Sequence, residues 1–92
     1  RNQYLDSEQK LIANNINIIL KDASKNFHAR EIQETINLVK DNLKKVGIEK
    51  VDYVEIRDNY TLENINNNDK SNARLFIAVY INDVRLIDNI KL

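Results

Sequence analysis

The sequence contains no cysteine, proline, methionine or tryptophan, and it has a single glycine. The lack of cysteine excludes disulfide bonds and thiolate metal ligands. The single glycine excludes a glycine-rich loop that cradles phosphate groups. No apolar run approaches the ~18 residues that a membrane-spanning helix needs. With one histidine and no clustered carboxylates, the sequence presents no recognisable metal site.

Neither sign of charge is in excess over the 92 residues, which contain 14 basic and 14 acidic side chains. Residues 1–47 carry eight basic and six acidic side chains, and residues 48–92 carry six and eight. A nucleic-acid-binding domain of this size would show a basic surface and a high isoelectric point, so this balance argues against one. The length corresponds to one domain.

Two segments carry apolar residues at helical spacing and predict an antiparallel helix hairpin. The first runs from about residue 7 to 25 and begins with a capping box formed by Asp6 and Gln9. The second covers residues 32–46, and the short link near residues 26–28 requires the helices to run antiparallel. The two apolar stripes consist of Ile12, Ile16, Ile19, Ala23, Ile32, Ile36, Val39, Leu43 and Val46.

Gly47 follows the second helix directly, at the position where a left-handed residue ends a helix. Glycine is preferred there because it has no Cβ and takes positive φ without strain. Lys44 and Lys45 fall in the last turn, where cations suit the helix dipole. We therefore predict a structural role for Gly47 as a C-cap.

After Gly47 the hydrophobic period changes from helical to two, which predicts three strands. Residues 50–57, 73–81 and 84–92 are rich in β-branched and aromatic side chains. Residues 58–72 are polar and predict a loop with one helical turn near residues 61–65 and a floppy tip at residues 66–68. The fold class is then α+β, with the helix hairpin packed on a three-stranded antiparallel sheet.

The two residues Asn82 and Asp83 predict a tight hairpin and set the register of the last two strands. The expected pairs are Ile81 with Val84, Val79 with Leu86, Ile77 with Asp88, and Leu75 with Ile90. These side chains share one face, which we place against the helices. The other face carries a candidate exposed patch of Phe76, Tyr80 and Ile87.

Asp88 is the one charged residue on the otherwise apolar face of this hairpin. An ionised carboxylate there is costly unless it is paired or hydrogen-bonded. We predict that Asp88 is a buried structural anchor with Arg57 as its partner; a ligand-binding role is the alternative. His28, at the start of the second helix, and Glu31 and Glu34 within it are interpreted as capping or surface residues.

Three stretches resemble the pantothenate synthetase (pantoate-beta-alanine ligase) family, in the order in which they occur there. They are RNQYLDSEQ at the start, VDYVEIRDNYTLE in the middle and RLIDNIKL at the end. The resemblance spans essentially all 92 residues and implies the C-terminal domain of that enzyme, which acts as a lid. In the family a K-M-S-S-R-N stretch joins the lid to an N-terminal Rossmann-like domain. Arg1 and Asn2 would be its last two letters, so we expect the catalytic domain to precede Arg1.

The resemblance implies an ATP-dependent ligase that joins pantoate to beta-alanine through a pantoyl-adenylate intermediate. It further implies Mg²⁺, a cytoplasmic location and a homodimer for the full-length enzyme, with no nucleic-acid or membrane partner. Arg1 is the one residue that matches a family position at the ATP phosphates, and its planar guanidinium suits phosphate oxygens. No catalytic residue and no metal ligand is expected in these 92 residues, so the fragment alone should be inactive.

A free-standing, non-enzymatic interaction domain is the alternative. Such a module would use the patch of Phe76, Tyr80 and Ile87 to dimerise. A nucleic-acid binder built on a small antiparallel sheet is a further class, which the zero net charge disfavours.

Overall fold

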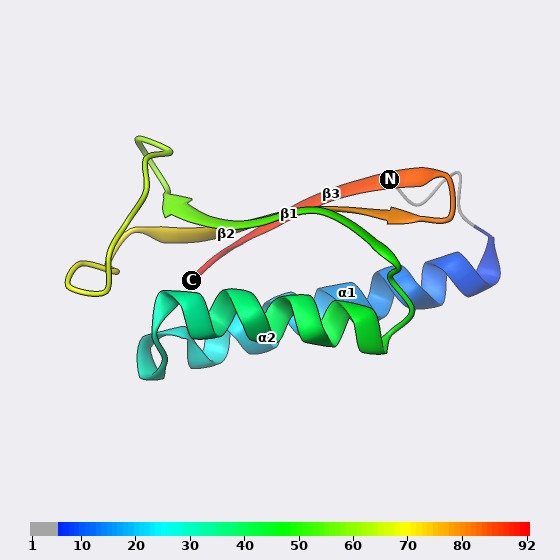
Figure 1. The fold of residues 1–92 in the computed structure, drawn as a ribbon, viewed down its shortest axis with the longest axis horizontal. Coiled ribbons are helices and arrows are strands. Elements are labelled where there is room, and N and C mark those ends of the chain that lie inside the picture. The colour runs from blue at the N-terminus through cyan, green and yellow to red at the C-terminus, as the bar shows by residue number, and fades with distance from the viewer. Residues whose placement is uncertain (1–5) are drawn as a thin grey trace.

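An antiparallel helix hairpin covers one face of a three-stranded sheet in residues 6–92, which are the residues that the computed structural model describes. Figure 1 shows both helices on the same side of the sheet and the other side open. The predicted α+β fold is therefore confirmed. In chain order the elements are α1 (Ser7–Asn26), the 3-10 turn η1 (Phe27–Ala29), α2 (Ile32–Lys45), β1 (Lys50–Asp58), β2 (Ala73–Ile81) and β3 (Val84–Lys91).

The sheet is antiparallel with the order β1-β2-β3, so β2 is the central strand. The predicted register of β2 and β3 is confirmed at all four pairs, including Ile77 opposite Asp88. Asn82 has a φ of 55°, as a tight turn between right-twisted strands requires. The register of β1 against β2 shifts between Val51 and Tyr53, which leaves Asp52 outside the ladder as in a β-bulge.

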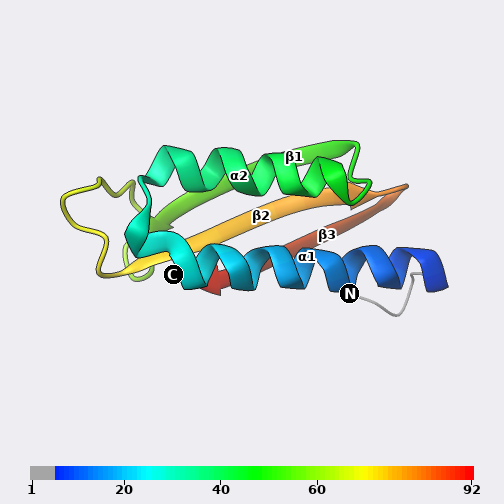
Figure 2. The same ribbon diagram turned by 90° about the horizontal axis from the view of Figure 1, so that it is seen from below.

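The core lies between the helix hairpin and the covered face of the sheet. α2 packs on β1 and α1 packs on β3, as the view from below shows (Figure 2). The side chains with almost no exposed surface are Ile16, Leu20, Phe27, Leu43, Ile48, Leu75, Ile77, Val39, Val79 and Thr35. Within residues 6–92, every buried side-chain nitrogen or oxygen has a hydrogen-bond partner. Neither α1 nor α2 is long and apolar enough to cross a membrane.

The loop between β1 and β2 differs from the prediction, because it contains turns and two isolated bridges and no helical turn. Asp58 Oδ1 accepts hydrogen bonds from the backbone N–H groups of Tyr60 at 2.8 Å and Thr61 at 2.9 Å. Such local side-chain bonds compete with helix formation. Leu62 takes a φ of 62° at the end of this turn.

The predicted floppy tip at residues 66–68 is also wrong, because the loop is bonded to the helix layer. Asn67 Oδ1 accepts a hydrogen bond from Ile32 N–H at 2.8 Å. Lys70 Nζ donates to the carbonyl oxygens of Phe27 at 3.1 Å and Arg30 at 2.5 Å. The loop therefore holds the link between α1 and α2 against the end of the sheet.

Candidate functional site

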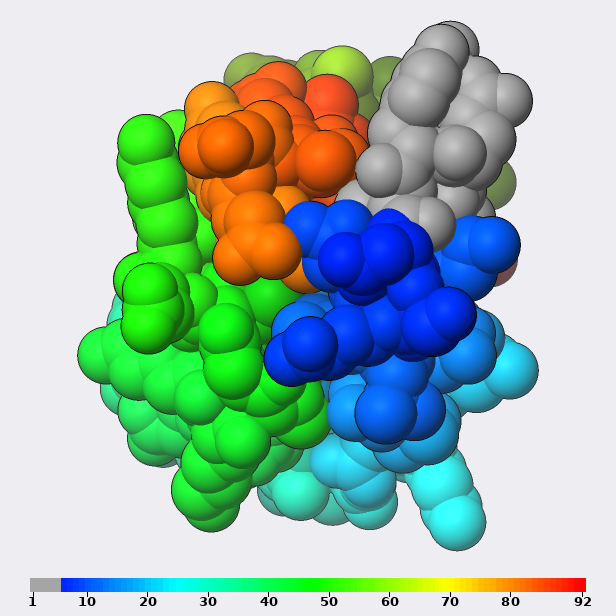
Figure 3. Space-filling view, turned by 90° about the vertical axis from the view of Figure 1, so that its right-hand side faces the viewer, coloured from blue at the N-terminus to red at the C-terminus, as the bar shows by residue number. Residues whose placement is uncertain are grey.

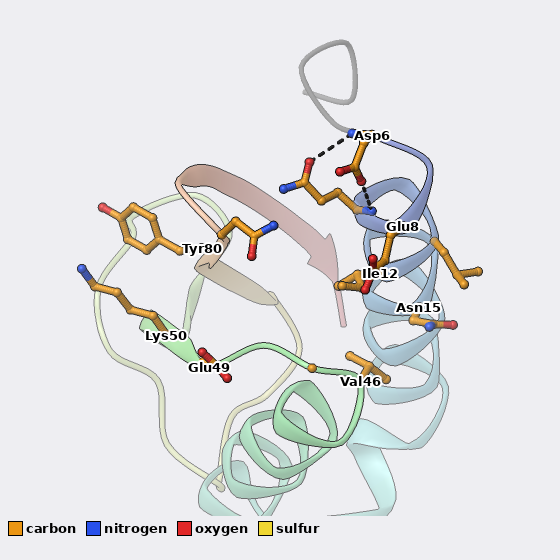
Figure 4. A pocket seen from close by; sticks show the side chains of 12 residues that line it. Asp6, Glu8, Ile12, Asn15, Val46, Glu49, Lys50 and Tyr80 are labelled. Atoms are coloured by element: carbon orange, nitrogen blue, oxygen red, sulfur yellow. Dashed lines mark hydrogen bonds between the residues drawn. The ribbon is translucent and has the colours of Figure 1, made fainter.

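A groove of about 620 Å³ lies at the end of the molecule where α1 begins. Figure 3 looks onto this end, and Figure 4 shows the side chains that line the groove. Its walls come from the first turns of α1, from residues 46–50 between α2 and β1, and from the turn between β2 and β3. The volume falls within the range of about 300–1,000 Å³ that is typical of small-molecule sites.

Two of the three groove walls are each fixed by local hydrogen bonds, one at the start of α1 and one at the end of α2. At the start of α1, Asp6 Oδ1 accepts from Gln9 N–H at 2.8 Å, and Gln9 Oε1 accepts from Asp6 N–H at 3.0 Å. This is the predicted capping box (Figure 4). At the end of α2, Gly47 N–H donates to the Lys44 carbonyl at 3.1 Å and Ile48 N–H donates to the Leu43 carbonyl at 3.0 Å.

The two bonds at the end of α2, donated by Gly47 N–H and Ile48 N–H, form a Schellman motif. In this motif the residue after the helix takes a left-handed conformation. Gly47 has a φ of 99°, as the C-cap prediction requires. The chain can therefore turn sharply from α2 into β1 and form the groove wall. The apolar side chain of Ile48, just beyond the glycine, is buried in the core.

The groove lining combines apolar side chains with an excess of acidic ones. Asp6, Glu8 and Glu49 contribute carboxylates, whereas Lys50 is the single cation that residues 6–92 add to this lining. The Lys50 ammonium lies 4.4 Å from the centre of the Tyr80 ring, at a distance where a cation is attracted to the aromatic face. With three carboxylates against one ammonium, the part of the lining that residues 6–92 supply does not by itself suit a polyphosphate.

The titratable groups that residues 6–92 bring to the groove are its three carboxylates, Lys50 and Tyr80. Residues 6–92 contain no cluster of three or more His, Cys, Asp or Glu side chains placed to hold a metal ion. This part of the chain therefore does not fit a Mg²⁺ site of its own. Among residues 6–92, the groove lining also contains no histidine or serine.

Arg1, the predicted phosphate-binding residue, lies outside the described residues. In the sequence, Arg1 is five positions before Asp6, the residue that caps α1.

The prediction that Asp88 is a buried, paired anchor is wrong. Asp88 is half-buried, and among residues 6–92 its carboxylate accepts one hydrogen bond, from the Asn89 N–H at 2.8 Å. Arg57 instead forms an ion pair with Glu55 at 2.9 Å and donates to the Leu62 carbonyl at 3.2 Å. The physical reason is that β3 is an edge strand, so a side chain on its covered face can reach water past α1.

The remaining candidates lie on the surface, as interpreted from the sequence. His28 is exposed in η1, where its ring meets the Phe27 ring edge-on at 5.2 Å between centroids. Glu31 and Glu34 are exposed at the start of α2. These side chains do not come together with the groove, so we assign them no role in it.

Sequence reasoning missed the Lys50 and Tyr80 pair. The two residues face each other because β1 pairs with β2 in a register that places Lys50 opposite Tyr80. The connection between these strands is long, and the bulge at Asp52 shifts the register further. A long loop does not fix strand register as a two-residue turn does, so no sequence signal pointed to this contact.

The statistical model of the family described as Pantoate-beta-alanine ligase matches residues 1–91 of the chain. Among curated proteins, the chain is similar to the pantothenate synthetase of Christiangramia forsetii, with 36% identity over 93 residues that cover 100% of this chain and 33% of that protein. The pantothenate synthetase of Anaplasma marginale is 41% identical over 96 residues, with 100% and 33% covered.

A third relative is the pantothenate synthetase of Clostridium botulinum, which is 38% identical over 93 residues that cover 97% of this chain and 32% of that protein. The chain thus spans about a third of the length of the curated relatives that it matches. The similarity extends over nearly the whole chain and is not confined to one motif.

Proposed function

Because this chain belongs to the pantoate-beta-alanine ligase family, we propose that it is the lid domain of an ATP-dependent ligase that makes pantothenate. The observation that carries the proposal is the family match over residues 1–91, together with relatives that are three times as long. The catalytic domain would be the additional polypeptide of such relatives. A free-standing interaction domain is not favoured, because the named relatives are synthetases.

The proposed reaction has two steps. The carboxylate of pantoate attacks the α-phosphorus of ATP, which forms pantoyl adenylate and releases pyrophosphate. The amine of beta-alanine then attacks the acyl carbon, which forms the amide and releases AMP. Negative charge grows on the pyrophosphate oxygens in the first step, so fixed cations at these oxygens lower the barrier.

The role we assign to this chain is to bring Arg1 to the phosphates and to exclude water from the acyl adenylate. The capping box at Asp6 and Gln9 supports this role, because it gives the chain after Arg1 a rigid point of attachment. Because the groove lining is acidic, we expect most contacts to the phosphates to come from the rest of the enzyme. For the whole enzyme, and not for this chain alone, we propose that it uses ATP and Mg²⁺, that it is cytoplasmic and that it forms a homodimer.

The test is Arg1→Ala in the full-length protein, with pantoyl adenylate measured before the steady state. Loss of one charge-assisted hydrogen bond to a developing anion costs roughly 2–3 kcal/mol, or about 30- to 150-fold in rate. Binding of beta-alanine should change much less. Lys10→Ala is the matched control, because Lys10 is exposed on α1 and does not line the groove.

An unchanged adenylation rate in Arg1→Ala would show that Arg1 does not contact the phosphates. The isolated 92-residue chain should form no pantothenate, since it has one phosphate-binding candidate and no described metal cluster. Pantothenate formation by the isolated chain would contradict the lid assignment itself.

A further inference from the structure

Three cations lie in one cross-strand row on the open face of the sheet. Arg57 of β1 is directly opposite Arg74 of β2, and Arg74 is directly opposite Lys91 of β3. Like charges that face each other across strands destabilise a sheet. A row of three is therefore a local violation of the rules of sheet stability, which is the kind of feature that marks a binding surface.

The row is only partly neutralised within the described part of the chain. Glu55 pairs with Arg57 at 2.9 Å. Arg74 contacts neutral groups: its Nε donates to Asn59 Oδ1 and its Nη1 donates to Asn89 Oδ1, both at 2.6 Å. The Lys91 side chain is exposed and has no hydrogen-bond or ion-pair partner in residues 6–92.

Two asparagine side chains thus hold the Arg74 guanidinium in place and leave its positive charge uncompensated. A guanidinium that is already oriented loses little freedom when it binds an anion, and its planar fork matches a carboxylate. The row formed by Arg57, Arg74 and Lys91, which we call the cation row, is therefore suited to carboxylates presented from outside the sheet.

An apolar strip lies beside the cation row on the same face. Tyr53 of β1 and Ile87 of β3 flank Ala78 of β2, which its neighbours cover completely. Phe76, with Glu55 and Asn89 opposite it, lies between this strip and the cation row. Ile87 is 58% exposed, an unusual state for a large apolar side chain in a strand. Apolar and aromatic side chains next to arginine are typical of the centre of a protein interface.

The dimensions of the open face suit a contact between domains. A nine-residue strand is about 30 Å long, and three strands are about 14 Å wide, so the face offers roughly 400 Å². Covered by a partner, it would bury roughly 800 Å² in total, within the 600–1,500 Å² that is typical of interfaces between domains of one chain. A polynucleotide is a poorer occupant, because the chain as a whole has no net positive charge.

We propose that the open face docks against an acidic surface of the polypeptide that makes up the other two thirds of the relatives' length, with the cation row binding its carboxylates. This inference rests on the proposed function, since it requires the chain to work joined to that polypeptide. The cation row is distinct from the groove, because it and the Lys50–Tyr80 pair lie about 20 Å apart along β2.

The test is hydroxyl-radical footprinting of the full-length protein, with the oxidation rate of Ile87 as the readout and Ile18 as internal reference. Ile18 is 64% exposed on α1, away from the sheet face. Arg74→Glu and Lys91→Glu are the test variants, and the second keeps the experiment decisive if the first does not fold. Lys40→Glu, an equal change of charge at an exposed position of α2, is the matched control.

A face that is docked about ten times more often than it is open exposes Ile87 for roughly a tenth of the time. Reversing one charge of the cation row should weaken docking by at least about tenfold, the size of one charge-assisted hydrogen bond. Ile87 should then be oxidised about fivefold faster in Arg74→Glu and Lys91→Glu, and at the parent rate in Lys40→Glu.

Equal Ile87 rates in all four proteins would overturn the proposal, as would binding of a single-stranded oligothymidylate probe that Arg74→Glu abolishes. Pantothenate formation, assayed on the same parent protein, separates this inference from the proposed function. If the parent protein forms pantothenate while Ile87 is oxidised as fast as in the charge-reversed variants, the docking is refuted and the proposed function is not. A docked face in a protein that makes no pantothenate would refute the function and leave the docking intact.

Discussion

The side chain of Asn67 caps a helix that begins 35 residues earlier, because its Oδ1 accepts the Ile32 N–H at 2.8 Å. The residue before α2, Glu31, makes no side-chain cap of its own. The first N–H groups of a helix have no partner within the helix, so a supplied acceptor stabilises the helix. The loop between β1 and β2 thus completes α2.

Asn67→Ala should lower the free energy of unfolding by about 1 kcal/mol, the usual cost of losing an N-cap acceptor. Urea denaturation of the 92-residue chain measures this change. Asn68→Ala is the control, because only the backbone N–H of Asn68 is hydrogen-bonded, to Asn66 Oδ1 at 2.9 Å. Equal stability of the two variants would show that the Asn67 bond does not contribute.

Lys70→Met should destabilise the link between α1 and α2 by about 1–3 kcal/mol. The substitution keeps a flexible apolar side chain near the Phe27 ring, which lies 4.6 Å from the Lys70 ammonium. It removes the two charge-assisted bonds to the Phe27 and Arg30 carbonyls. Lys21→Met, at an exposed position in the middle of α1, is the matched control for the same substitution.

Thermal unfolding of both variants is the measurement for this link. A melting temperature of Lys70→Met equal to that of Lys21→Met would mean that water replaces the lost ammonium without cost. Faster amide exchange in η1 and at the start of α2, absent in the control variant, would locate the effect at the link.

The features that could be predicted from the sequence are those set by neighbouring residues. The capping box at Asp6, the glycine after α2 and the two-residue turn at Asn82 each depend on a few consecutive positions. The turn also fixed the register of β2 and β3, since a two-residue loop leaves one pairing that buries the apolar face.

The features that could not be predicted join distant parts of the chain. Lys70 and Arg30 are 40 residues apart, and no periodicity links a polar loop to a helix terminus. The exposure of Asp88 could not be predicted for a related reason. The hairpin register places Asp88 on the apolar face, but strand order decides whether that position is central or at an edge. The cation row likewise appears only when all three strands are aligned.

Gly47→Ala should cost on the order of 1 kcal/mol in the free energy of unfolding. An added Cβ would lie 4.0 Å from Ile12 Cδ1, an ordinary contact distance, so the cost comes from the φ of 99° and not from a clash. Gly47→Asn should lose less, because asparagine tolerates a left-handed conformation better than alanine does. Chemical denaturation of the parent, Gly47→Ala and Gly47→Asn measures the order of their stabilities. A Gly47→Ala variant as stable as the parent would contradict the prediction.

Asp88→Ala should change the stability by no more than about 0.5 kcal/mol, as is usual for a substitution away from buried networks. The carboxylate accepts one bond from the neighbouring Asn89 N–H and has no ion-pair partner in residues 6–92. If Asp88 were buried and ion-paired, removing its carboxylate would instead cost about 3–5 kcal/mol. A loss of unfolding free energy above about 2 kcal/mol in Asp88→Ala would therefore show that Asp88 is a buried, paired anchor after all.

Asp58 should make the stability depend on pH in the acid range. The backbone N–H groups of Thr61 and Tyr60 donate to its carboxylate, and these bonds lower the pKa of Asp58 below its usual value of 3.8. In the unfolded chain the bonds are lost and the pKa returns to its usual value. Since the folded state holds the proton less tightly, the contribution of Asp58 is complete above the unfolded pKa and is lost as the pH falls through the folded pKa.

Asp58→Asn isolates this contribution, because the amide oxygen can still accept a hydrogen bond but does not titrate. The difference in unfolding free energy between parent and Asp58→Asn should be constant above about pH 5 and should shrink as the pH falls below the unfolded pKa of about 4. NMR titration of the Asp58 carboxyl carbon gives the folded pKa directly. A midpoint at or above 3.8 would show that the turn does not bind the ionised carboxylate. In that case another interaction would have to hold Leu62 at its φ of 62°, because the Asp58 turn leads directly into that residue.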